Sequence, residues 1–145
     1  DFLVENGVEM TTLPDLLARA DFISLNCSLN PTSYHLINAQ TLSLVRPSAV
    51  LINTSRGPVV DEPALVQALQ AGQLSGAALD VFEQEPLPTE SPLRSMPNVL
   101  LAPHNSNSSP FYWERVHRNS IRNLLLGLQL PVEDLDSLRA EAQPQ

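Results

Sequence analysis

Three side chains of the sequence could together carry out acid–base chemistry on a small acid: Arg56, Glu85 and His104. A guanidinium is planar and holds a carboxylate through two parallel hydrogen bonds. A histidine near its unperturbed pKa takes or gives a proton at neutral pH, and a neighbouring carboxylate orients the ring and favours its charged form. These residue types therefore suit a small hydroxy or keto acid as the substrate.

Each of the three residues also has an interpretation without catalytic function. An arginine after a strand is commonly a solvated turn residue, a glutamate in a proline-rich loop commonly lies on the surface, and a histidine after proline is often structural. Their positions favour a shared site, because each follows a predicted strand. Parallel strands end at one edge of their sheet, which is where such folds bind ligands.

The elements that must position these side chains follow from the pattern of apolar residues. Short runs of strand length predict strands at 7–10, 22–25, 49–53, 76–81 and 98–102. Helices are predicted between and after them, at 12–20, weakly at 34–45, at 61–72 and at 109–128. This alternation predicts the α/β class, with a Rossmann-like, mostly parallel sheet and flanking helices. The continuous apolar runs predict strands that are covered on both faces.

Composition excludes several classes of protein. The formal net charge of -8 leaves no basic face for nucleic acid. No apolar run approaches the roughly 20 residues that cross a bilayer, and the first residues lack the pattern of a secretion signal. Cys27 is the single cysteine, so the sequence offers neither an internal disulfide nor a cysteine cluster for a metal. We therefore expect a cytoplasmic protein without nucleic-acid, membrane or metal partners.

Four segments, in this order, resemble signature segments of the D-isomer-specific 2-hydroxyacid dehydrogenases. They are 20–33 (Ala-Asp-Phe-Ile-Ser-Leu-Asn-Cys-Ser-Leu-Asn-Pro-Thr-Ser), 53–62 (Asn-Thr-Ser-Arg-Gly-Pro-Val-Val-Asp-Glu), 76–86 (Gly-Ala-Ala-Leu-Asp-Val-Phe-Glu-Gln-Glu-Pro) and 98–104 (Asn-Val-Leu-Leu-Ala-Pro-His). The resemblance covers roughly residues 8 to 131, so it is far more specific than a lone glycine motif.

The resemblance implies a role for each of the three candidate residues. Arg56 would bind the substrate carboxylate, His104 would donate or accept the proton, and Glu85 would pair with His104. The cofactor would be NAD, with NADP as the open alternative, and hydride would pass between the nicotinamide and the substrate carbon. Glu85 stands where the related formate dehydrogenases carry Gln, which favours a small 2-hydroxy or 2-keto acid over formate.

On the same basis, six further residues would line the cofactor site. Asp80 would contact the nicotinamide side. Backbone or side-chain groups of five other residues would line the cleft: Cys27, Ser28, Thr32, Thr54 and Ser55. Cys27 also has a purely structural interpretation, as a small residue at the end of a strand.

Members of this family carry a substrate-binding domain and a Gly-x-Gly-x-x-Gly turn upstream of these segments. In this sequence no two glycines stand two positions apart; they are Gly7, Gly57, Gly72, Gly76 and Gly127. We therefore interpret 1–108 as the C-terminal portion of an NAD(P)-binding domain, 109–131 as a long helix that follows it, and 132–145 as a C-terminal tail. Because half of each ligand site would be absent, we expect the 145-residue chain by itself to be inactive.

Two functions of different classes remain open at this point. The first is an oxidoreductase that transfers a hydride between NAD(P)H and a small 2-hydroxy or 2-keto acid. The second is a truncated, non-catalytic nucleotide-binding or interaction module, which would resemble the corepressor branch of the family. The apolar face of the helix predicted at 109–128 fits either, because it could pack within the domain or against a second subunit. Full-length family members are usually homodimers.

Overall fold

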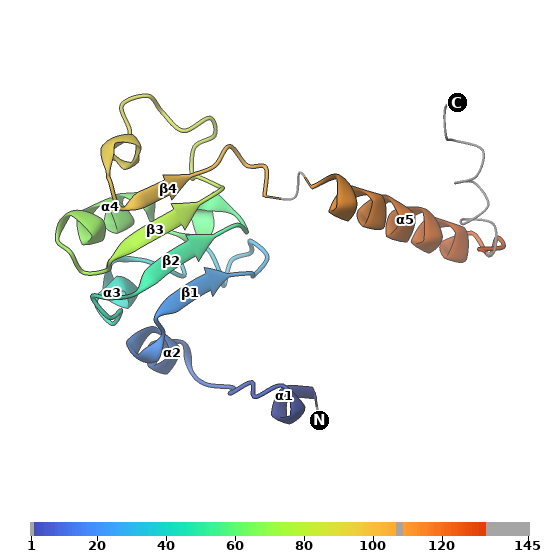
Figure 1. The fold of residues 1–145 in the computed structure, drawn as a ribbon, viewed down its shortest axis with the longest axis horizontal. Helices are drawn as coiled ribbons and strands as arrows, with labels where there is room; N and C mark the ends of the chain where they lie inside the picture. The colour runs from blue at the N-terminus through green and yellow to red at the C-terminus, as the bar shows by residue number, and fades with distance from the viewer. Residues whose placement is uncertain (1, 107–108, 133–145) are drawn as a thin grey trace. The chain divides into compact units, whose positions relative to one another are not determined.

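The computed structural model describes residues 2–106 and 109–132 (Figure 1). The chain divides after Asn105 into two compact units, and each is described by itself. The predicted boundary after residue 108 adjoins residues 107–108, which are not among the described ones. The predicted tail, apart from Val132, also lies outside the described residues.

A four-stranded parallel sheet forms the centre of the first unit, with neighbouring strands in the order β1-β2-β3-β4. Its strands are β1 (Phe22–Leu25), β2 (Val50–Asn53), β3 (Gly76–Leu79) and β4 (Val99–Leu101). Its helices are α1 (Phe2–Glu5), α2 (Leu13–Arg19), α3 (Ala39–Leu42) and α4 (Glu62–Gln70), with short 3-10 helices η1 (Gly57–Val59) and η2 (Pro92–Ser95). The predicted α/β class and parallel, Rossmann-like sheet are confirmed.

The helices start where polar side chains satisfy free backbone N–H groups. The Thr12 hydroxyl accepts from the N–H of Asp15 at the start of α2, and the Asp61 carboxylate accepts from the N–H of Ala64 at the start of α4. Asn38 caps α3 in the same way. The weak helix predicted over 34–45 is much shorter than expected, since only Ala39–Leu42 is helical.

The core lies on one face of the sheet, where α2, α3 and α4 pack. Side chains at every second strand position form two rows across this face: Ile23, Leu51, Ala77 and Val99 in one, and Leu25, Asn53, Leu79 and Leu101 in the other. Buried leucines of the three helices pack onto these rows, namely Leu17, Leu42, Leu65 and Leu69. In the view of Figure 1, α3 and α4 lie behind the sheet.

The opposite face of the sheet is less covered within the first unit. On the central strands, Val50, Ile52 and Ala78 are half-buried on this face, so the prediction of strands fully covered on both faces is wrong within the described residues. On the edge strands, Phe22 is 72% exposed and Leu100 is 70% exposed. The reason lies in the strand order. Crossovers between parallel strands are right-handed, so strands that follow one another in a single direction send every connecting helix to the same side.

The predicted strand at 7–10 is also wrong. Gly7 adopts the left-handed conformation, with φ 65°, and ends a turn in which the N–H of Val8 donates to the carbonyl of Leu3. Val8 and Met10 are exposed. A short apolar run becomes a strand only where a neighbouring strand pairs with it, and the sheet formed by the described residues begins at β1.

The second unit contains α5 (Pro110–Gly127), close to the predicted bounds of 109–128. Its exposed apolar side chains recur at helical spacing, and they include Trp113, Val116, Ile121 and Leu124. Among the residues that the structure describes, no helix is both long enough and apolar enough to cross a membrane.

Candidate active site

The turn after β2 presents Arg56, and Asn53 shapes that turn. The Asn53 side chain is 1% exposed. Its Oδ1 accepts from the backbone N–H and the hydroxyl of Ser55, at 3.1 and 2.9 Å, and its Nδ2 donates to the carbonyl of Arg56 at 3.0 Å. Sequence reasoning missed Asn53, although an Asn two residues before a Ser at the end of a strand is a recognisable signal for this kind of turn.

Gly57, the next residue, lets this turn approach the loop that follows β3. A Cβ atom built on Gly57 would lie 1.9 Å from both the carbonyl carbon and the carbonyl oxygen of Phe82, and 2.5 Å from the backbone nitrogen of Glu83. No side chain fits there without moving the backbone. The turn that carries Arg56 and the loop that leads to Glu85 are therefore in direct backbone contact.

The structure brings together two of the predicted catalytic residues, His104 and Glu85. Nδ1 of His104 lies 2.8 Å from Oε2 of Glu85. The other carboxylate oxygen, Oε1, accepts from the backbone N–H of Phe82 at 3.0 Å. Hydrogen bonding to His104 and then to Phe82 lowers the pKa of the Glu85 carboxyl, so the group is ionised at neutral pH.

His104 is held in an uncommon backbone conformation, with φ 54°. Asp80 fixes the chain just beyond it, because Oδ1 of this buried carboxylate accepts from the backbone N–H of Asn105 at 2.8 Å. Asp80 thus helps to place the His104 loop. Its predicted contact with the nicotinamide side stays a prediction.

Seven of the nine predicted site residues line two separate pockets, and Asp80 and Thr32 border neither. One, of about 530 Å³, lies at the ends of β1 and β2 and includes five of them: Cys27, Ser28, Thr54, Ser55 and Arg56. The other, of about 670 Å³, lies between the loops after β3 and β4 and includes Glu85 and His104. Thr32 borders neither pocket; its backbone N–H and hydroxyl both donate to Oδ1 of Asn30, at 2.9 and 2.7 Å.

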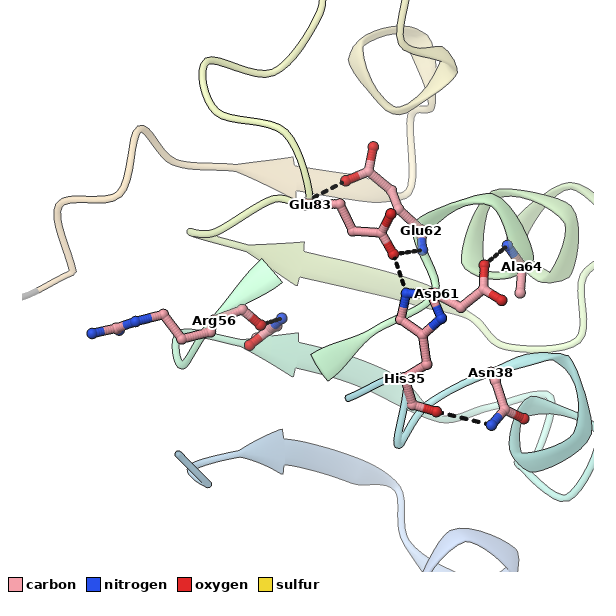
Figure 2. A network of polar contacts seen from close by, with 8 residues as sticks. His35, Asn38, Arg56, Asp61, Glu62, Ala64 and Glu83 are labelled. Carbon is pink, nitrogen blue, oxygen red and sulfur yellow. Dashed lines mark hydrogen bonds and ion pairs between the residues drawn. The ribbon is translucent and has the colours of Figure 1, made fainter. Parts of the chain in front are cut away.

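Arg56 and His104 follow β2 and β4, which are two strand spacings apart in the sheet. Neighbouring strands are about 4.8 Å apart, so roughly 10 Å separates these two strand ends. Long side chains reaching inward from such positions can engage a ligand of a few heavy atoms. Figure 2 shows the Arg56 side chain extending away from the Glu62 and Glu83 carboxylates. Its Nη1 donates to the carbonyl of Ser55 at 2.6 Å, and its other N–H groups could bind an anion.

The first pocket has polar groups of the kind that bind the amide and sugar hydroxyls of a nicotinamide nucleotide. Ser28, Thr54 and Ser55 border it, and strand carboxyl ends are where parallel α/β sheets bind such ligands. These residues therefore fit the nicotinamide end of a dinucleotide.

The comparisons with known proteins agree with this geometry. Residues 2–106 match the family model described as "D-isomer specific 2-hydroxyacid dehydrogenase, NAD binding domain". A glyoxylate reductase of Thermofilum pendens is 47% identical over 123 residues, which cover 85% of this chain and 36% of that protein.

Solved structures give the same result. A D-isomer specific 2-hydroxyacid dehydrogenase of Xanthobacter autotrophicus, in complex with NADPH and MES, is 39% identical with a TM-score of 0.69, covering 82% of this chain and 49% of that one. A glyoxylate/hydroxypyruvate reductase of Sinorhizobium meliloti, in complex with NADP and malonate, is 43% identical with a TM-score of 0.64, covering 68% and 31%. This chain thus spans less than half the length of each relative. It belongs to the D-isomer specific 2-hydroxyacid dehydrogenase family, within the family's NAD-binding domain.

Proposed function

We propose that the complete protein containing this chain is a reductase of small 2-keto acids that uses NADH or NADPH. The observation that carries the proposal is the His104–Glu85 pair, which lies at the same sheet edge as the Arg56 turn. The substrate class is supported by the similarity to reductases of glyoxylate and hydroxypyruvate. These relatives favour the enzyme over a non-catalytic interaction module.

The pair explains how His104 would handle a proton. An ionised carboxylate only accepts hydrogen bonds, so Nδ1 of His104 carries the hydrogen that bonds to Glu85. Nε2 is left for the substrate. In its charged form the ring donates the Nε2 proton to the carbonyl oxygen during reduction, and in its neutral form Nε2 accepts the hydroxyl proton during oxidation.

The other residues would bind and orient the reactants. Arg56 would hold the substrate carboxylate through its planar guanidinium, which fixes the carbonyl carbon relative to His104. Cys27, Ser28, Thr54 and Ser55 would border the nicotinamide end of the cofactor, with Asp80 and Thr32 as further predicted contacts. When bound, the cofactor supplies or removes the hydride.

We also infer a homodimeric, cytoplasmic protein without a nucleic-acid partner. The net charge of -8 supports the last point, because a nucleic-acid surface needs clustered positive charge. The single cysteine, Cys27, agrees with a reducing compartment. Sedimentation of the complete protein tests the dimer, and a monomer would contradict it.

To test the proposal, the protein is expressed from the complete open reading frame, and oxidation of NADH and of NADPH is followed with glyoxylate and hydroxypyruvate as substrates. We expect turnover by the unmodified enzyme and a fall in kcat of about 10²- to 10⁴-fold in His104→Ala, with the Kd for the reduced nucleotide unchanged. Arg56→Ala should mainly raise KM for the keto acid. Glu90→Ala, a substitution of an exposed glutamate in the same loop region, is the matched control. Near-normal turnover by His104→Ala would contradict the mechanism.

A further inference from the structure

A second histidine–glutamate contact connects the segment after β1 with the loop after β3. Nε2 of His35 lies 2.7 Å from Oε1 of Glu83 (Figure 2), and the two side chains are 29% and 30% exposed. Because an ionised carboxylate only accepts, Nε2 carries the hydrogen and donates it to Glu83. Forty-eight residues separate the partners in sequence, so this contact joins two distant parts of the chain.

Glu83 is also bound to the start of α4. Its Oε1 accepts from the backbone N–H of Glu62 at 3.1 Å, and its own backbone N–H donates to Oε2 of Glu62 at 3.3 Å. The Glu83 carboxylate is therefore held by His35 and by α4 together.

His35 is itself firmly placed. Its backbone has φ 48°, a conformation that few residue types adopt readily. Its N–H donates to the carbonyl of Pro58 at 2.9 Å, and its carbonyl accepts from Nδ2 of Asn38 at 2.9 Å. The Tyr34 ring stacks on the imidazole, with ring centroids 4.0 Å apart. These contacts restrain the ring that donates to Glu83.

Both ends of this contact lead to the proposed site. Pro58, which binds the His35 backbone, lies two residues after Arg56. Glu83 lies two residues before Glu85, which bonds to His104. The two segments touch at Gly57, whose Cα packs against the backbone of the loop.

We propose that His35 is a positioning residue which, through Glu83, fixes the 82–85 loop against the 57–62 segment and so sets where His104 and Arg56 stand relative to each other. This inference rests on the roles proposed for His104 and Arg56. The two groups must engage one small substrate at the same time. Small misplacements of reacting groups cost up to about 100-fold in rate.

Two substitutions in the complete enzyme distinguish the effect of the side-chain donor at position 35 from the effect of the backbone conformation there. Asn adopts the left-handed conformation readily, so His35→Asn preserves the backbone conformation without strain. The Asn side chain is too short for its amide to reach Glu83. His35→Gln places its amide nitrogen about as far from Cβ as Nε2 of histidine, so it retains a donor to Glu83. Glu90→Gln is the matched control on the surface.

We expect His35→Asn to lower kcat/KM for glyoxylate about 10-fold, with effects on both kcat and the keto-acid KM, while the Kd for NADH is unchanged. His35→Gln should stay within about threefold of the unmodified enzyme. A general loss of folded protein would instead lower kcat alone, and active-site titration corrects for it. Unchanged kinetics in His35→Asn, or a His35→Gln enzyme as impaired as His35→Asn, would overturn the proposal.

Amide hydrogen exchange provides a readout that does not depend on turnover. The N–H groups of Phe82 and Glu83 should exchange faster in His35→Asn than in the unmodified protein, and His35→Gln should restore their protection. Equal exchange in all three proteins overturns the positioning role even in an inactive enzyme. If the unmodified enzyme reduces no keto acid, the proposed function fails. If it is active and sensitive to His104→Ala but indifferent to His35→Asn, only the inference about His35 fails.

Discussion

The molecule contains two histidine–glutamate pairs that are alike in geometry and differ in which nitrogen they use. His35–Glu83 and His104–Glu85 have N···O distances of 2.7 and 2.8 Å, both histidines have positive φ, and the two glutamates belong to one loop. His104 bonds through Nδ1, the nitrogen nearer its backbone, whereas His35 bonds through Nε2, the outer one.

This difference separates a group that can react from a group that holds structure. Bonding through Nδ1 leaves the outer nitrogen of His104 for a ligand, and its side chain is 49% exposed beside a pocket. His35 uses its outer nitrogen, Nε2, to bond to Glu83. The same carboxylate oxygen of Glu83 also accepts from the backbone N–H of Glu62 at the start of α4. The same two residue types can therefore support catalysis or rigidity, according to the nitrogen that faces the carboxylate.

The largest expected difference between the two pairs is in kcat, when the carboxylate of each pair is removed in turn from the complete enzyme. Glu85→Ala takes away the group that bonds to Nδ1 of His104 and orients the ring, so we expect kcat to fall at least about 100-fold. Glu83→Ala removes the acceptor for His35 and for the backbone N–H of Glu62, neither of which bonds to His104, and should lower kcat about 10-fold. Steady-state kinetics with glyoxylate measures both. Equal losses would erase the distinction between the two pairs.

Gly57 lies against the backbone of the loop that carries both glutamates, so a side chain at this position should disturb both pairs. Its Cβ would overlap the backbone of Phe82, so Gly57→Ala should lower the free energy of unfolding by about 1–3 kcal/mol and also reduce activity. Gly127→Ala is the control: nothing lies within 4 Å of its added Cβ, and alanine favours a helix. Thermal unfolding of the two variants measures the difference, and a Gly57→Ala protein as stable as Gly127→Ala would refute the close approach.

A smaller effect should appear in the pH dependence of stability. Because hydrogen bonding to His104 lowers the pKa of Glu85 in the folded state, the stabilisation is present above the unfolded pKa and is lost as pH falls through the folded pKa. Solvent screening limits it to about 1 kcal/mol or less. Denaturant unfolding of Glu85→Gln and the unmodified protein should therefore differ at neutral pH and converge as pH falls through the folded pKa of Glu85. A constant difference would argue against the pair.

Glu62, beside the other pair, should show the smallest effect, and with the opposite sign. Burial raises its pKa, and the charge of Glu83 adds to the increase against the opposing hydrogen bond from the Glu83 N–H. A carboxyl whose folded pKa is raised is best tolerated at low pH and destabilises as pH rises through that pKa. Glu62→Gln should thus gain stability relative to the unmodified protein between acidic and neutral pH. A relative loss over that range would contradict the assignment.

Much of the fold could be predicted from the sequence, because apolar runs and helix caps are local signals. Asp61 and Thr12 start helices as expected, and the four sheet strands lie where their apolar runs do. The apolar run at 7–10 led to a wrong prediction. Whether such a run becomes a strand depends on pairing with a neighbouring strand, which the run itself does not encode. The open face of the sheet depends on the order of the strands, which is likewise a property of the whole fold.

The candidate site was predictable only in part. The resemblance to a family pointed to Glu85 and His104, and their contact is present. His35 and Glu83 gave no such signal, since their contact depends on how two distant loops meet. The close approach at Gly57 also exists only in three dimensions.

One residue, Gln84, separates the glutamates that serve the two histidines. That spacing makes this stretch intolerant of length changes, although loops generally accept them. Inserting or deleting one residue between Glu83 and Glu85 would leave one histidine without its partner. Changes further along the loop, around Thr89 and Glu90, would preserve the spacing. Efforts to remodel this loop should therefore vary the part around Thr89 and Glu90 and leave Glu83, Gln84 and Glu85 unchanged.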